Sequence, residues 1–174
     1  VISGINIPAG SNAVLVYESR VNQFAPLAEG SAINNTAAVS GGGLSAPVSA
    51  EETITAASQP QLTISKSLCP ATIAENGQLT YTFVIQNSGS QPATAGDSII
   101  VRDLFDPILE GLTVTLDGDP LAVGTGYTYD QATGEFATIA GQITVPAATF
   151  TQDPVTGVWA TTPGEATLTV TGTV

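Results

Sequence analysis

The chain has 174 residues, of which 43% are hydrophobic and 10% are charged, and its 3 basic and 15 acidic side chains give a net charge of −12. That apolar fraction excludes a disordered acidic tail, and three basic residues are too few for a nucleic-acid surface or an anionic membrane. Because the chain has no His and one Cys, it cannot assemble imidazole catalysis, a His-based zinc site or a Ser or Cys triad. We therefore expect no enzymatic activity, no metal and no cofactor.

Alternating apolar and polar residues predict strands along the chain, and no amphipathic helical stripe occurs. In chain order, the predicted strands include residues 13–17, 62–65, 79–85, 112–116 and 166–171. The chain is therefore predicted to be all-β. No apolar run is long enough for a membrane span, and the first residues lack the pattern of a signal peptide, so we expect a mature or excised piece of a longer protein.

Two segments share a turn pattern, residues 130–134 and 153–157. In each, an Asp opens a type I turn through its side chain and a Gly four residues later supplies the left-handed conformation that leads into a strand. Both segments are therefore predicted hairpin tips, and Asp117-Gly118 is a third tight turn. Calcium binding at these tips is disfavoured because no Asp-x-Asp-x-Asp cluster occurs.

A domain boundary is predicted near residues 57–61, where Gln59-Pro60 ends a stretch rich in Ala, Ser and Thr. Residues 61–174 have the size of a β-sandwich of about seven strands. Residues 1–58 are too few, and too rich in Gly around 41–43, to bury a core alone.

A short internal similarity explains why the second segment has the size of a domain and the first does not. Residues 8–21 resemble residues 163–174 in their turn-then-strand layout. If both are copies of one unit, the chain holds two domains of one type out of phase. Residues 1–58 would then be the C-terminal part of a first β-sandwich domain, and residues 61–174 a second one that lacks its closing strand.

Several motifs resemble the repeat domain of many large bacterial surface proteins, the domain of unknown function number eleven. The matching segments are Leu62–Ser67, Pro70–Ile73, Glu75–Phe83, Ile85–Gly89, Val101–Asp106 and Gly111–Val114, and Ile33–Val39 is similar to the closing strand of that family. The resemblance implies an immunoglobulin-like β-sandwich in a structural or adhesive protein outside the cell, at a bacterial surface. It implies no catalytic residues.

A sandwich without its closing strand exposes unpaired backbone groups and apolar side chains, so another strand should complete it. The predicted assembly strand is Ile33, Asn34, Asn35, Thr36, Ala37, Ala38 and Val39. It could come from the same chain or from a neighbouring copy, and a neighbour would build a head-to-tail homopolymer resembling a pilus. The alternative is a piece of a tandem array of adhesive modules.

Lys66 is the only lysine of the chain and lies on the first predicted strand of the second domain. A strand lysine can form an isopeptide bond with an Asn when a buried acid assists. Asn34 or Asn35 would be the acceptor, and Asp103 or Glu75 the acid. Alternatively, Lys66 is an exposed edge residue that discourages strand pairing.

Three aromatic residues offer a function of another class. Tyr127, Tyr129 and Trp159 could form a platform for sugar rings if they project to one outer face, which would make the chain a carbohydrate-binding module. If they are buried, this interpretation fails. Cys69 precedes a proline at a strand end and is expected to be a small packed residue.

Overall fold

The computed structural model describes residues 1–26 and 28–174, and almost all of its regular structure is β-strand. The predicted all-β class is confirmed. The elements are β1 (Ala32–Val39), β2 (Val48–Thr55), β3 (Leu62–Cys69), β4 (Gln78–Asn87), the short 3-10 helix η1 (Ala95–Asp97), β5 (Arg102–Leu104), β6 (Glu110–Leu116), β7 (Asp119–Leu121), β8 (Tyr127–Tyr129), β9 (Glu135–Thr138), β10 (Thr149–Gln152), β11 (Trp159–Thr162) and β12 (Gly164–Thr173).

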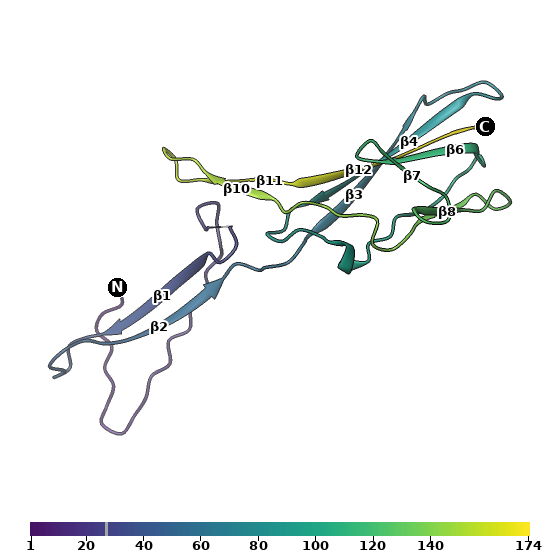
Figure 1. Ribbon diagram of the computed structural model, residues 1–174. Coiled ribbons are helices and arrows are strands. Elements are labelled where there is room, and N and C mark those ends of the chain that lie inside the picture. The colour runs from purple at the N-terminus through teal and green to yellow at the C-terminus, as the bar shows by residue number, and fades with distance from the viewer. Residues whose placement is uncertain (27) are drawn as a thin grey trace.

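Two sheets pack face to face as a β-sandwich (Figure 1). The larger sheet has the strand order β3-β4-β12-β6-β7, and the smaller sheet has the order β5-β9-β8. One core cluster joins both sheets, with buried side chains from β4, β6 and β12 on one side and from β8 and β9 on the other. Its members include Tyr81, Phe83, Phe105, Leu109, Val114, Tyr127, Phe136, Leu168 and Val170.

The pair β4 and β12 forms the centre of the larger sheet. The two strands are antiparallel and pair over all ten residues, from Gln78 with Thr173 to Asn87 with Gly164. Their side chains alternate between buried and less buried positions, because successive residues of a strand point to opposite faces. The predicted segments 79–85 and 166–171 therefore lie in strands, as their alternation indicates.

The predicted hairpin tips are confirmed. Residues 130–134 connect β8 to β9, and residues 153–157 connect β10 to β11. In the second tip, the Asp153 carboxylate accepts the backbone N–H groups of Val155 and Thr156, both at 2.8 Å, and Gly157 has a φ of 73°. An Asp side chain thus closes the turn that a left-handed glycine ends.

Asn87 ends β4 and is fully buried. Its side-chain amide donates to the carbonyl oxygens of Gln91 at 2.7 Å and Pro146 at 3.0 Å, and its Oδ1 accepts the N–H groups of Gln61 and Gly89, both at 2.9 Å. All four hydrogen-bonding positions of the carboxamide are used, as burial requires. The Asn-x-Gly motif therefore ties three separate segments together.

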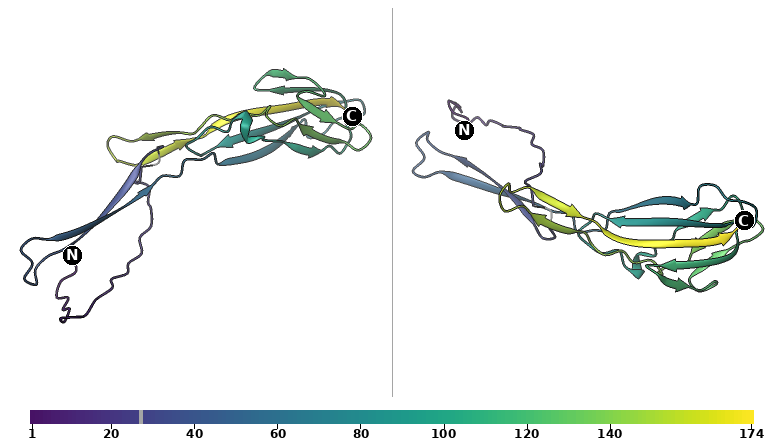
Figure 2. Two further views of the ribbon diagram at one scale, coloured as in Figure 1. Left: turned by 60° about the horizontal axis from the view of Figure 1, so that its bottom comes forward. Right: turned by 90° about the horizontal axis from the view of Figure 1, so that it is seen from above.

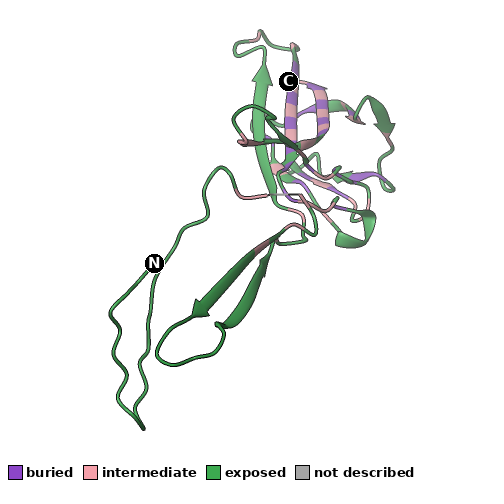
Figure 3. Ribbon diagram, turned by 90° about the vertical axis from the view of Figure 1, so that its left-hand side faces the viewer, coloured by how far each residue is buried: buried purple, intermediate pink, exposed green. Residues whose placement is uncertain are grey.

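Strands β1 and β2 form an antiparallel hairpin that projects away from the sandwich (Figure 2). Nearly every residue of the hairpin is exposed (Figure 3). At its base, the hairpin is attached to the sandwich, where the Ser90 hydroxyl donates to the Ala57 carbonyl at 2.8 Å and Gln91 Nε2 donates to Ser58 Oγ at 3.0 Å. The hairpin is thus fixed at one end and free of the core.

Two sequence predictions are wrong. Residues 13–17 are predicted as a strand but form none, because a strand needs a hydrogen-bonding partner and this segment has none among the described residues. Cys69 is exposed at the end of β3 rather than packed. In the parts of the chain that the structure describes, no helix has the length and hydropathy that crossing a membrane requires.

Candidate strand-binding site

β3 lies at one edge of the larger sheet and turns apolar side chains toward the core side. Residues that pair directly on neighbouring strands point to the same face, and Ile64 pairs with buried Ile85 while Lys66 pairs with buried Phe83. The side chains of this face form a row, which we call the core-facing row of β3. It consists of Leu62, Ile64, Lys66 and Leu68.

This row is exposed, although the equivalent row on the other side of β4 is not. On β12, Leu168 and Val170 are both 0% exposed, because the smaller sheet covers them. On β3, Ile64 is 57% exposed and Leu68 is 43% exposed. The smaller sheet therefore covers β12 but ends before it covers β3, and its last strand on that side is β5.

Lys66 on β3 and Asp103 on β5 connect the edge of the larger sheet to the edge of the smaller sheet. The Lys66 ammonium forms an ion pair with Oδ2 of Asp103, and Asp103 faces inward because it pairs with buried Phe136 on β9. Oδ2 is shielded from solvent and has no hydrogen-bond partner among the described residues. The Lys66 side chain is 41% exposed and that of Asp103 is 17% exposed, so the pair is open on one side only.

Aromatic rings surround the Lys66 ammonium on its inner side. Nζ lies 4.6 Å from the ring centroid of Tyr81, 5.7 Å from that of Phe83 and 5.8 Å from that of Phe105. Rings at these distances attract a cation through their negative faces. Lys66 is thus held beside the core, with one side of its side chain open to solvent.

β1 presents a second apolar row, in which Ile33 is half-buried and Ala37 and Val39 are exposed. These residues pair with Ile54, Ala50 and Val48 of β2, so this face of the hairpin is apolar except for the pair Asn35 and Glu52. Asn35 lies on this apolar face, opposite Glu52, and its Nδ2 donates to the Tyr17 hydroxyl at 2.5 Å.

Asn34 lies on the opposite, polar face of the hairpin. Its Oδ1 accepts the Thr53 hydroxyl at 2.9 Å, and Thr53 is its partner on β2. The structure therefore distinguishes the two candidate acceptors, which the sequence left equivalent.

The remaining candidate residues are not brought together. Glu75 is exposed in the loop between β3 and β4, while the Lys66 ammonium pairs with Asp103. Tyr127 is buried, and Tyr129 uses its hydroxyl to donate to the Leu109 carbonyl and to accept the Leu109 N–H, both at 2.9 Å. Trp159 lies on β11, in a different sheet. Tyr127 and Tyr129 both face the core and Trp159 lies in another sheet, so the three aromatic residues do not form one outer face.

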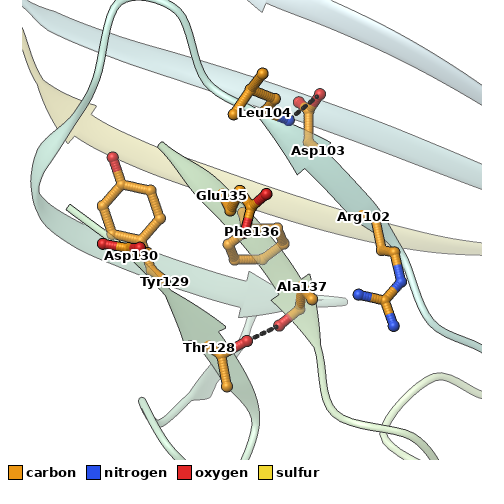
Figure 4. Close-up of a pocket in the computed structure, with 9 residues that line it drawn as sticks. All are labelled: Arg102, Asp103, Leu104, Thr128, Tyr129, Asp130, Glu135, Phe136 and Ala137. Atoms are coloured by element: carbon orange, nitrogen blue, oxygen red, sulfur yellow. Dashed lines mark hydrogen bonds between the residues drawn. The ribbon is translucent and has the colours of Figure 1, made fainter. Parts of the chain in front are cut away.

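A hollow of about 620 Å³, whose lining includes Asp103, lies over the smaller sheet (Figure 4). Its lining combines the cation of Arg102 with the carboxylates of Asp130 and Glu135, and includes the Thr128 hydroxyl. Oδ1 of Asp130 already accepts the Ala132 N–H at 2.8 Å within its own turn. In the part of the chain that the structure describes, no group of three His, Cys, Asp or Glu side chains converges as a metal site.

Comparisons with family models, with curated proteins and with solved structures found no match to this chain.

Sequence reasoning missed the aromatic rings around Lys66 and the exposure of its row. The signal was present, because Lys66 alternates with Leu62, Ile64 and Leu68 and must share their face. What the sequence could not provide was the point at which the smaller sheet ends.

Proposed function

We propose that this protein is a structural subunit of an extracellular filament at a bacterial cell surface and not an enzyme. In the filament, β1 of one copy completes the sandwich of the next copy by lying beside β5 and covering the core-facing row of β3. The observation that carries this proposal is the contrast between β3 and β12, whose equivalent apolar rows are exposed and buried, respectively.

The occupant that we propose is β1 of a second copy, because its length and pattern fit the site. β1 and β3 each have eight residues, and each carries a row of four alternating side chains. In the antiparallel alignment that sets Asn35 against Lys66, the other pairs are Ile33 with Leu68, Ala37 with Ile64 and Val39 with Leu62. Every apolar side chain of one row then meets an apolar side chain of the other, which buries both rows.

A second copy is a better donor than the same chain. The hairpin points away from its own sandwich (Figures 1 and 2), and hydrogen bonds at its base hold that direction. In addition, the backbone N–H of Trp159 donates to the carbonyl of Gln23 at 3.0 Å and anchors the segment that precedes the hairpin. Folding back would break these bonds, whereas donation to a neighbour keeps them.

The donor strand and the acceptor site are different surfaces of one chain. A contact between different surfaces is head-to-tail and leaves a free donor and a free acceptor after each addition, so it produces a filament and not a closed dimer. The resemblance of residues 62–114 to a repeat domain of bacterial surface proteins supports the extracellular location. The absence of Met and the single Cys suit exposure to oxidants.

A matched pair of substitutions tests the assembly. Ala37 and Ala38 are adjacent on β1 and both exposed, but only Ala37 lies on the face that would be buried. We expect concentrated wild-type protein to form fibres that negative-stain electron microscopy shows. Ala37→Asp should reduce fibre mass at least about tenfold, because an unpaired carboxylate would be buried, whereas Ala38→Asp should assemble normally.

Two outcomes would contradict the proposal. One is wild-type protein that stays monomeric at high concentration by sedimentation. The other is an equal loss of fibres in both variants, which would show that the face of β1 does not matter. Circular dichroism of each variant serves as the folding control.

A further inference from the structure

Resting on the proposed function, we infer that Lys66 forms a covalent amide with Asn35 of the second copy that donates β1, and that Asp103 transfers the protons. The filament would then be cross-linked between neighbouring copies, with one isopeptide bond at each contact. Three features of the structure carry this inference: the position of Lys66, the solvent-shielded Asp103 oxygen that pairs with it, and the face of β1 on which Asn35 lies.

The acceptor side is already arranged for the reaction. The Lys66 ammonium is placed between Asp103 and the ring of Tyr81, with Phe105 on the same side. Oδ2 of Asp103 is inaccessible to solvent and makes no hydrogen bond within the described residues, so its free lone pair is directed at the ammonium. Oδ1 of Asp103 accepts the Leu104 N–H at 3.0 Å, which leaves the shielded Oδ2 to serve the Lys66 ammonium.

The donor side brings a carboxamide to this pair. Asn35 is the one polar residue in the row Ile33, Asn35, Ala37 and Val39. Its Nδ2 donates to the Tyr17 hydroxyl within its own chain, and its carboxamide oxygen is left to accept a hydrogen bond when this face becomes buried. In the antiparallel alignment that pairs all four positions, Asn35 lies opposite Lys66. A parallel alignment that kept Asn35 against Lys66 would place Val39 beyond Leu68, outside the row.

The reaction is a transamidation that needs no oxidant or co-reactant. First, the Lys66 ammonium gives a proton to Asp103, which leaves a neutral amine and a carboxylic acid. The amine attacks Cγ of Asn35, a C–N bond forms, and the acid donates a hydrogen bond to the carboxamide oxygen. The C–N bond to Nδ2 then breaks as Nδ2 takes one proton from the attacking nitrogen and leaves as ammonia. The ammonia takes the remaining proton from Asp103 and departs as ammonium, so Asp103 is again a carboxylate.

Binding of the donor strand supplies the condition that starts the reaction. In the free subunit, water reaches Lys66 from its exposed side and favours the ion pair. When β1 of the second copy covers the row, it excludes that water, and a low-dielectric environment favours the neutral acid and amine over the charged pair. The amide therefore forms after assembly and not before it.

The test examines fibres of the full chain by denaturing gel electrophoresis and intact-mass measurement. We expect wild-type fibres to give a ladder of species in hot detergent, each dimer lighter by one ammonia than two chains. Lys66→Arg, Asp103→Ala and Asn35→Ala should form fibres that dissolve fully to monomers, because each removes one of the three groups. The matched control Asn34→Ala should keep the ladder, since Asn34 lies on the other face.

Three outcomes would overturn the inference in distinguishable ways. Wild-type fibres that dissolve fully to monomers would exclude the amide but leave the filament intact. Monomers lighter by one water would place the amide between Lys66 and Asp103 of one chain. A complete absence of fibres in the wild type would reject the proposed function together with the inference. Mapping of the linked peptides by tandem mass spectrometry supports the inference only if Lys66 is joined to Asn35.

Discussion

The Asn87 side chain accepts the backbone N–H of Gln61 at 2.9 Å, so the residue that ends β4 fixes the point at which the chain enters β3. Because Asn87 also holds Gly89 and the Pro146 carbonyl, it joins the start of β3 to the loops that contain these two residues. A single buried carboxamide thus sets the position of the edge strand that carries the candidate site.

Asn87→Ala should lower the free energy of unfolding by about 2–4 kcal/mol, because it leaves two carbonyls and two N–H groups without their partners, in hydrogen bonds that are buried or part-buried. Urea denaturation followed by tryptophan fluorescence measures the change. The exposed variant Asn34→Ala serves as the control and should differ from wild type by less than about 0.5 kcal/mol. Equal stability of both variants would show that the Asn87 network contributes nothing.

A pair of glycines separates backbone strain from steric clash. Gly134 has a φ of 80°, and a Cβ atom there would lie 2.4 Å from the carbonyl oxygen of Phe105, whereas Gly118 has a φ of 91° with no atom within 4 Å. Gly118→Ala should cost about 1 kcal/mol through strain alone. Gly134→Ala should cost about 2–4 kcal/mol, since the tip of the β8–β9 hairpin must shift. Thermal unfolding of both variants measures the two losses of stability. A larger loss in Gly118→Ala than in Gly134→Ala would contradict this prediction.

The tip of the β10–β11 hairpin should loosen in acid. Hydrogen bonds from the backbone N–H groups of Thr156 and Val155 lower the pKa of Asp153 below its ordinary 3.8. Since the folded-state pKa is lowered, the stabilisation is present above pH 3.8 and is lost as the pH falls through the lower, folded value. The amide NMR shifts of Val155 and Thr156 should therefore titrate together with a midpoint below 3.8. A midpoint at or above 3.8 would contradict the turn geometry.

The strands and turns of the sandwich follow from local sequence. Alternation predicts β4 and β12, and the Asp and Gly spacing predicts the tips at residues 130–134 and 153–157, because these signals depend on neighbouring residues alone. Residues 13–17 show the limit of this reasoning. They are a continuous run of hydrophobic residues typical of a strand, but strand formation also requires a partner, which local sequence does not specify.

The candidate site was only half predictable. Lys66, Asp103 and the pair Asn34 and Asn35 could be named because few residues of these types lie in the motif segments. The choice of Asp103 over Glu75 depends on the packing of β5 against β3, and the choice of Asn35 over Asn34 depends on the register of β1 with β2. Both are relationships between segments distant in sequence, so only the folded chain reveals them.

The ten-residue pairing of β4 with β12 has a mechanical consequence. The chain enters β3 beside Asn87 and leaves β12 beside Gln78, at the opposite end of β4. Tension applied between these two points pulls β3 and β12 in opposite directions along β4. Both hydrogen-bond ladders then bear the load in shear, with all their bonds strained together instead of opening one after another. The sandwich therefore resists stretching best when the force runs along β4 between these two points.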